Sequence, residues 1–226
     1  MTTATALPAD AGTAPRPAAG AALRRARPDE APALARLLAA AFADDALMLW
    51  AFPDPDHRAR VMPAFFRVQL DQCLAHQGVT VATDDAGALL GALLFLPPGT
   101  WEDPGGADDD AVRALTEAVD ADLSGESAER LAAIVRLQHR RHPRHRRHYY
   151  LAFIGVHPDA RAAGTAEALV SAVLAEVDAA GQAAYAETSS SGGARLCENH
   201  GFTRFGEVIA LPGGGPRLAP VWRGPR

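Results

Sequence analysis

Apolar residues change their spacing several times along the chain, and each spacing predicts a different type of element. Between positions 29 and 42 they recur three or four residues apart, which predicts an amphipathic helix capped by Asp29. A second helix is predicted over 56–76. The apolar runs 79–83 and 88–96 flank the turn sequence Asp-Asp-Ala-Gly, and they predict an antiparallel hairpin.

The second half of the chain alternates strands and helices more regularly. A strand over 149–156 is followed by a helix over 164–180 and by a strand over 183–188. The other predicted elements are a strand over 23–26, a helix over 111–139, a short helix over 194–200 and a C-terminal hairpin through Gly213, Gly214 and Gly215. This alternation predicts an α/β fold.

The length of 226 residues suits one domain of ordinary core size. We expect that domain over 21–226 and a disordered tail over 1–20, because the tail is mostly alanine, threonine and proline. The tail lacks the basic start and apolar middle of a secretory signal. We also expect no membrane span, because no run of eighteen apolar residues occurs.

Composition excludes several kinds of chemistry. All 22 basic residues are arginine, so a phosphate loop that ends in Gly-Lys-Ser/Thr, a pyridoxal Schiff base and a lysine nucleophile are excluded. Cys73 and Cys197 are too few for a disulfide framework or a multi-cysteine zinc site, and they favour a cytoplasmic location. The net charge of -5 gives no overall attraction for nucleic acid.

The strongest chemical signal is the turn that joins the strand over 149–156 to the helix over 164–180. The residues concerned are the end of the apolar strand and the small or basic residues after it: Ile154, Gly155, Val156, Arg161, Ala162, Ala163, Gly164, Thr165 and Ala166. Small side chains let a ligand approach the backbone, and the first N–H groups of a helix bind anions. The pattern indicates a diphosphate site, although an ordinary strand-to-helix turn in an alanine-rich protein has the same composition.

Within this turn, the segment 161–166 resembles the Arg/Gln-x-x-Gly-x-Gly/Ala signature of the GNAT N-acetyltransferases. The segments 41–45, 52–54 and 96–99 are similar to those of the bacterial subgroup that contains puromycin N-acetyltransferase. The resemblance extends over 23–223. It implies a GNAT fold with a mixed central sheet of about six to seven strands, splayed between the fourth and fifth, and helices on both faces.

The resemblance also implies acetyl-coenzyme A as the co-substrate and no metal. The backbone N–H groups from Arg161 to Ala166 would hold its diphosphate, and Gly164 would permit close approach. Its pantetheine arm would pair with the strand edge formed by Ile154, Gly155 and Val156. Ala162 and Ala163 stand where many relatives carry glycine and a basic residue, which weakens phosphate binding.

Two residues are candidates for catalysis. Glu187, on the strand over 183–188, could accept the proton of the amine directly or through a water molecule. A solvated carboxylate, or an ion pair with Arg161 or Arg195, fits the same position. A backbone N–H near Ile154–Val156 would stabilise the developing oxyanion, as it does in the family.

Cys197 departs from the family pattern. Relatives carry a tyrosine at this position that protonates the thiolate of the coenzyme, and many carry asparagine where Gly193 stands. A thiol is a weaker hydrogen-bond donor than a phenol. Cys197 could therefore act as a weak acid, form an acetyl-thioester, or simply be a small buried residue.

Aromatic residues are the candidates for the acceptor pocket. If the family layout holds, Phe42, Trp50, Tyr149 and Tyr150 line it, although core packing explains them equally well. An acidic group is more consistent with a solvated loop than with attraction of a cationic amine. Its members are Glu102, Asp103, Asp108, Asp109 and Asp110.

The segment 136–148 contains six arginines and four histidines, the histidines at every third position. Metal binding is disfavoured, because Pro143 breaks the helix and the arginines repel a cation. A nucleic-acid patch is disfavoured too, because aromatic residues are not interleaved. A surface connector fits best, and attraction of coenzyme phosphates is a third use.

Together these features predict an N-acetyltransferase that transfers the acetyl group of acetyl-CoA to the amine of a small molecule by direct attack. Nucleic acid and membranes are not expected partners. The alternative is a degenerate domain that binds acetyl-CoA without turnover and has a regulatory or scaffolding role. Cys197 and Gly193 motivate that alternative.

Overall fold

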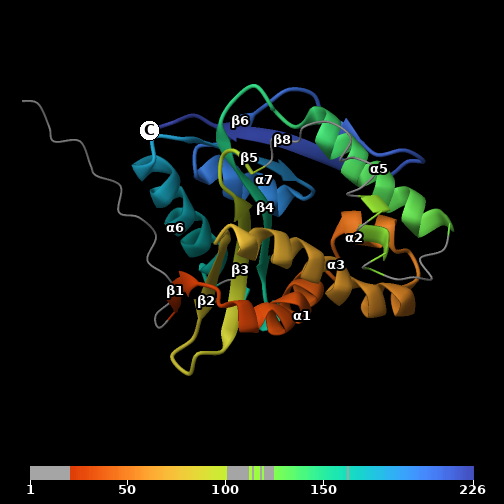
Figure 1. The fold of residues 1–226 in the computed structure, drawn as a ribbon, viewed down its shortest axis with the longest axis horizontal. Helices are drawn as coiled ribbons and strands as arrows, with labels where there is room; N and C mark the ends of the chain where they lie inside the picture. Colours follow the sequence, from red (N-terminus) through yellow and green to blue (C-terminus); the bar gives the residue numbers. More distant parts are fainter. Residues whose placement is uncertain (1–20, 101–111, 114, 118, 120–124, 162) are drawn as a thin grey trace, which may run out of the picture.

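The computed structural model describes residues 21–100, 112, 113, 115–117, 119, 125–161 and 163–226. The predicted tail over 1–20 and Ala162 lie outside the described residues. So does the acidic group of Glu102, Asp103, Asp108, Asp109 and Asp110. Figure 1 shows a central sheet with helices packed on both of its faces.

The first half of the chain supplies one edge of the sheet and most of one helical layer. Its strands are β1 (Ala22–Arg25), β2 (Val79–Thr83) and β3 (Leu89–Leu96), and its helices are α1 (Ala31–Ala41), α2 (Ala46–Ala51) and α3 (Pro55–Ala75). Asp29 does not cap α1 as predicted, because the 3-10 turn Pro28–Glu30 precedes the helix. The short α2 was not predicted; Asp45 caps it by accepting a hydrogen bond from the Leu47 N–H at 2.9 Å.

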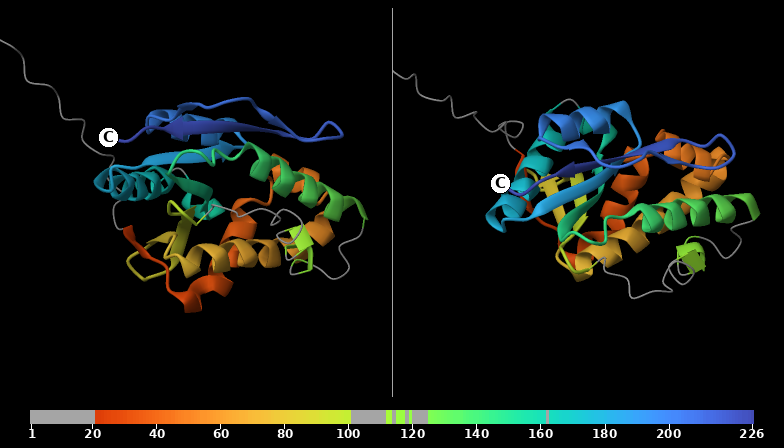
Figure 2. Two further views of the ribbon diagram at one scale, coloured as in Figure 1. Left: turned by 45° about the horizontal axis from the view of Figure 1, so that its top comes forward. Right: turned by 90° about the horizontal axis from the view of Figure 1, so that it is seen from above.

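The second half supplies the other edge and the remaining helices. Its helices are α5 (Gly125–Arg141), α6 (Thr165–Ala179) and α7 (Ser191–Asn199), and its strands are β4 (His148–Val156), β5 (Ala183–Thr188), β6 (Thr203–Arg204), β7 (Ile209–Ala210) and β8 (Arg217–Arg223). Figure 2 shows α5 beside the hairpin of β7 and β8. The predicted strand over 183–188 is confirmed residue for residue.

The sheet has the order β1-β2-β3-β4-β5-β8-β6, with β7 paired to β8, so its described strands number eight rather than six or seven. The pair β4–β5 is parallel, and every other described pair is antiparallel. A parallel pair requires a crossover, and α6 supplies it. The predicted mixed sheet with flanking helices is therefore confirmed.

Strand β4 is paired very differently along its two edges. Toward β3 it is paired from Tyr150 to Val156, with an irregularity between Leu94 and Phe95 that leaves Ala152 as an extra residue. Toward β5 it is paired only over His148–Tyr150, opposite Ala183–Tyr185. Beyond Tyr150 the two strands separate, as predicted for the fourth and fifth strands.

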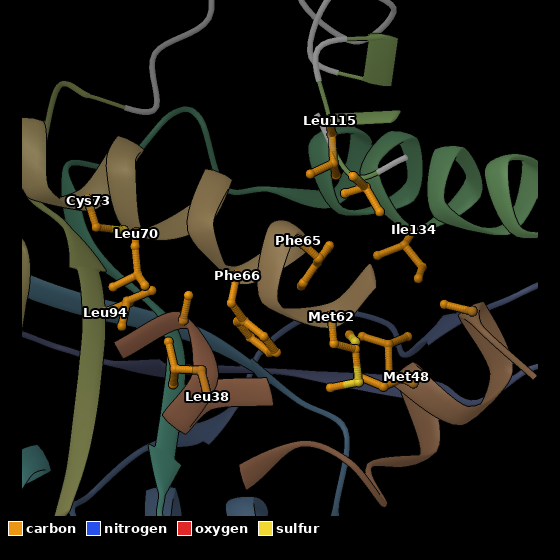
Figure 3. Close-up of a cluster of buried hydrophobic side chains, with 14 of the residues drawn as sticks. Leu38, Met48, Met62, Phe65, Phe66, Leu70, Cys73, Leu94, Leu115 and Ile134 are labelled. Carbon is orange, nitrogen blue, oxygen red and sulfur yellow. The ribbon is translucent and has the colours of Figure 1, made fainter. Parts of the chain in front are cut away.

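Two apolar clusters cover the two faces of the sheet. On one face, α1 and α3 pack with α2 and α5 around a cluster that includes Phe65, Phe66 and Leu94 (Figure 3). On the other face, α6 packs Leu169 and Val173 against the sheet. With the partly buried residues packed against each included, the first cluster has more aromatic rings than the second, and we call them the aromatic and the aliphatic cluster.

Candidate active site

A cavity of about 840 Å³ lies where β4 and β5 separate. Its lining residues come from both faces of the sheet: Phe65 and Ile134 belong to the aromatic cluster, whereas Val170 and Leu196 pack with the aliphatic one. The cavity therefore connects the two faces through the gap between the strands. A ligand can reach from one face to the other without passing round the edge of the sheet.

The edge of β4 offers unpaired backbone groups to this gap. The N–H of His157 donates to Leu90 of β3 at 2.8 Å, and successive residues of a strand direct their backbone groups to opposite sides. Val156 and Ile154 consequently direct their N–H and C=O groups away from β3, into the gap. This edge can pair with an extended ligand in the way a further strand would.

The anion site was predicted at the start of α6. Gly164 has a φ of 72°, a left-handed conformation that side-chain-bearing residues rarely adopt, and an added Cβ there would meet no atom within 4 Å. The first N–H groups of α6 follow directly at Thr165 and Ala166, and Ala166 lines the cavity. This arrangement fits a diphosphate, because N–H groups at the positive end of a helix are exposed beside open space.

Arg161 and Gly155 are both engaged with α1. The guanidinium of Arg161 donates to the backbone carbonyl of Ala41, the last residue of α1, at 2.8 Å. A Cβ on Gly155 would lie 2.7 Å from Cδ2 of Leu38, which is closer than any ordinary contact. A side chain at this position would therefore force Leu38 and the end of α1 to move, a reason for glycine that the sequence did not reveal.

Glu187 lies at the cavity on the aromatic side of the gap. Its Oε2 accepts hydrogen bonds from the Tyr150 hydroxyl at 2.7 Å and from Nε2 of Gln138 at 3.3 Å. Its Oε1 is buried and makes no hydrogen bond to the described residues. Burial raises the pKa of Glu187 above its usual value, although the hydroxyls of Tyr150 and Tyr185 and the amide of Gln138 act to lower it. A carboxyl with a raised pKa at the edge of a cavity is suited to accept a proton.

Cys197 also lines the cavity, on α7 and beside the aliphatic cluster. Burial, together with the neighbouring Glu198, raises the pKa of its thiol to about 11. The thiol is therefore protonated at neutral pH. This protonation state is the reverse of what a cysteine nucleophile needs, since the thiolate is the reactive form.

Of the four predicted acceptor residues, two lie at the cavity and two do not. Phe42 and Tyr150 line it. Tyr149 faces the opposite side of the sheet, where its ring packs 6.0 Å from that of Phe95, because consecutive residues of a strand alternate. Trp50 is not among the lining residues; the guanidinium carbon of Arg130 lies over its ring, 5.2 Å from the ring centroid.

Sequence analysis missed three polar groups that shape this region. Gln138 comes from α5 and bonds Glu187. Ser189 donates to Oδ2 of Asp45 at 2.9 Å, which joins the end of β5 to the start of α2. These contacts link residues far apart in the chain, so no local sequence motif predicts them.

The third missed group is a pair of buried histidines. The predicted surface connector is wrong at two positions: His142 and His148 are 6% and 8% exposed, and their Nε2 atoms lie 2.9 Å apart. The regular spacing of the histidines was the available signal.

No group of three or more His, Cys, Asp or Glu side chains among the described residues could hold a metal ion. No helix in the described part of the chain is long and apolar enough to cross a membrane.

No protein-family model matches the sequence, and no curated protein matches it either. Solved structures do match. An acetyltransferase from Corynebacterium glutamicum ATCC 13032, described as histone acetyltransferase HPA2 and related, is 25% identical with a TM-score of 0.66, and the match covers 92% of this chain and 97% of that one.

Two further structures share the fold at lower identity. The polyamine N-acetyltransferase of Drosophila melanogaster, which forms N-acetylagmatine, is 15% identical over 90% of this chain and 99% of its own, with a TM-score of 0.64. A chain of the NatC complex bound to Gag peptide and CoA is 14% identical over 92% and 99%, with a TM-score of 0.53. This protein therefore has the fold of the GNAT acetyltransferases, and its neighbours are consistent with an acetyl-CoA-dependent acyltransferase.

Proposed function

We propose that this protein transfers the acetyl group of acetyl-CoA to the amine of a small molecule, by direct attack within a ternary complex. The observation that carries the proposal is the cavity between β4 and β5, which has an unpaired strand edge on one side and the Glu187 carboxyl on the other. The puromycin N-acetyltransferase-like subgroup and a cytoplasmic location, the latter supported by free Cys73 and Cys197, are parts of the same proposal.

Acetyl-CoA would supply the activated thioester, and the residues of this chain would hold it. The N–H groups at Thr165 and Ala166 would bind its diphosphate, with Ala163 and Gly164 leaving the approach open. The edge of β4 at Ile154 and Val156 would pair with the pantetheine arm. Arg161 would add positive charge nearby, although one of its donors is engaged with Ala41.

Glu187 would act as the general base. Amines are mostly protonated at neutral pH and must lose a proton to attack a thioester, and the raised pKa of Glu187 brings its basicity closer to that of the amine. Its carboxyl lines the cavity and would take the proton directly or through a water molecule. A backbone N–H of Ile154 or Val156 would stabilise the charge that develops on the acetyl oxygen.

Cys197 would donate a proton to the departing thiolate, since its pKa of about 11 keeps the thiol protonated. The same raised pKa disfavours the acetyl-thioester alternative. A thiol is a weak donor, and the departing thiolate leaves readily without help. We therefore assign Cys197 a smaller part than Glu187.

Titration calorimetry with acetyl-CoA tests the coenzyme site. Ala166→Asp should weaken binding of acetyl-CoA by about tenfold or more, because it places a negative charge beside the diphosphate. The fold should tolerate this change, since acidic residues stabilise the first turn of a helix. Ala128→Asp makes the same change in the first turn of α5, away from the cavity lining, and should leave affinity unchanged.

A thiol-release assay over a panel of amines then tests transfer. Release of CoA that depends on an added amine supports the proposed activity. Binding of acetyl-CoA without release for any amine would instead support the regulatory alternative. If acetyl-CoA does not bind at all, both proposals fail.

A further inference from the structure

The aromatic half of the cavity has a wall of three phenylalanine rings. Phe42, Phe65 and Phe153 all line it, and they come from the end of α1, from α3 and from β4. The ring of Phe153 lies 5.9 Å from that of Phe42 and 6.1 Å from that of Phe65, at interplanar angles of 83° and 88°. These edge-to-face contacts hold the rings in place and present an apolar surface to a ligand.

Aliphatic side chains complete this half of the cavity. Figure 3 shows Phe65, Leu115 and Ile134 close together, although they come from separate parts of the chain. Further aliphatic lining residues on this side include Leu47, Met48, Val68, Leu131 and Val135. A bound group in this half would be surrounded mostly by hydrocarbon, because the polar side chains that α3 and α5 add to the lining are only Gln69, Gln72, Gln138 and His139.

Few charges accompany these walls. The carboxylates among the described lining residues are Asp45, Glu167 and Glu187. Asp45 already accepts hydrogen bonds from the Leu47 N–H and the Ser189 hydroxyl. Glu167 belongs to the first turn of α6, on the opposite face of the sheet. Glu187 is thus the carboxylate best placed to receive a cationic nitrogen at the gap.

We propose that the acceptor is an amine with one basic nitrogen on an aromatic or bulky apolar body, and that polyamines are poor acceptors. This inference rests on the proposed acetyl transfer. The nitrogen would lie at Glu187 and the apolar body against the phenylalanine wall. A second cationic group, the guanidinium of agmatine or a further ammonium of spermidine, would lie mostly among hydrocarbon groups, which is costly for an unpaired charge.

The native protein tests this directly. We expect kcat/KM for 2-phenylethylamine and tryptamine to exceed that for agmatine and spermidine by tenfold or more. Equal or faster acetylation of agmatine or spermidine would overturn the inference and leave the proposed transfer intact. If no amine is acetylated, the proposed transfer fails, and the acceptor preference is then tested by binding alone. Calorimetry of the CoA-saturated protein should show tighter binding of 2-phenylethylamine than of spermidine, and the opposite order would overturn the inference.

A pair of charge-adding variants locates the selectivity. Val135→Glu places a carboxylate in the apolar half of the cavity, so the preference for 2-phenylethylamine over agmatine should fall about tenfold. Val208→Glu adds the same charge at an exposed valine that is not among the lining residues, and the preference should be unchanged. An unchanged preference in folded Val135→Glu, verified by circular dichroism, would overturn the assignment of this half to the acceptor.

Discussion

Two ionisable groups, the partly buried Glu187 and the buried His142, lie on either side of the same tyrosine, and they differ in what they face. The Tyr150 hydroxyl donates to Glu187, and the Tyr150 ring packs 5.1 Å from that of His142, which is paired with His148. Burial shifts both groups toward their neutral forms: it raises the pKa of Glu187 and lowers that of His142 to about 2. The protein therefore bears the cost of desolvation twice within a small volume.

The difference lies in the partners. His148 directs Nδ1 at the backbone carbonyl of Arg146, 2.6 Å away, and its Nε2 at His142, so both ring nitrogens of His148 contact protein groups. Glu187 borders the cavity, and no hydrogen bond from the described residues reaches its Oε1. A buried ionisable group that contacts only the protein stabilises or shapes the fold, whereas one beside a cavity can also interact with a bound ligand.

The largest effect should come from Glu187→Gln. Loss of a general base typically costs on the order of 10²- to 10⁴-fold in kcat. The variant should be more stable than the native protein at neutral pH. The raised pKa means that the folded state favours the protonated carboxyl, so ionisation of Glu187 lowers the free energy of unfolding. Glutamine cannot ionise and removes that cost. Thiol release and thermal unfolding at neutral pH measure the two effects.

Glu207→Gln is the matched control for that change. Glu207 is an exposed residue that pairs with Arg141 at 3.1 Å, so both kcat and melting temperature should stay near the native values. A Glu187→Gln variant that retained full activity would contradict the assignment of the base.

The next effect in size is the loss of folding stability at low pH that the buried histidine pair should cause. The pKa of His142 is lowered from 6.5 to about 2 by burial, so the unfolded chain binds a proton that the folded one does not. Stability should be intact above pH 6.5 and should fall as the pH drops toward 2, by up to about 1.4 kcal/mol per pH unit for this residue. Urea unfolding across pH 4–7 checks the slope.

His142→Gln removes that proton-binding difference and should flatten the slope. His76→Gln, at an exposed histidine just after α3, should leave the slope as it is. If both variants lose as much stability between pH 7 and pH 4 as the native protein does, the buried pair does not account for the loss of stability in acid.

The smallest effect should come from Tyr150→Phe. The hydroxyl of Tyr150 acts to lower the pKa of Glu187, so its loss should raise that pKa further and move the acidic limb of the pH–rate profile upward. Activity at neutral pH should fall severalfold, in keeping with about 1 kcal/mol for one hydrogen bond. Tyr149→Phe is the control, because Tyr149 lies on the other face; a shift in that variant as well would contradict the role of Tyr150.

Local sequence signals predicted much of the fold. The strand Ala183–Thr188 was predicted with its bounds, and β4 and α6 within one residue at each end, because charged or turn-forming residues flank each of these apolar runs. The six-residue α2 is too short for a helical period to show. Helix α7 begins three residues earlier than predicted, because Ser190 caps it by accepting the Gly193 N–H at 3.1 Å.

The candidate site was harder to predict, because its contacts join distant segments. The turn before α6 could be recognised from small residues in one continuous segment. In contrast, Gln138 and Glu187 are 49 positions apart, and Ser189 and Asp45 are 144 apart. Tyr149 and Tyr150 are adjacent in sequence, and only the pairing of β4 determines which of them faces the cavity.

The absence of a side chain at Gly155 has a consequence beyond the backbone there. A methyl group at this position would lie 3.1 Å from Cβ of Ala41 and 3.2 Å from Cε2 of Phe42, as well as against Leu38. The end of α1 would have to give way by a few tenths of an ångström, and the ring of Phe42, which lines the cavity, lies against the same position. Gly155→Ala would therefore change the width of the cavity at Phe42 without changing any residue that lines it, and under the proposed function it would change the range of amines that fit.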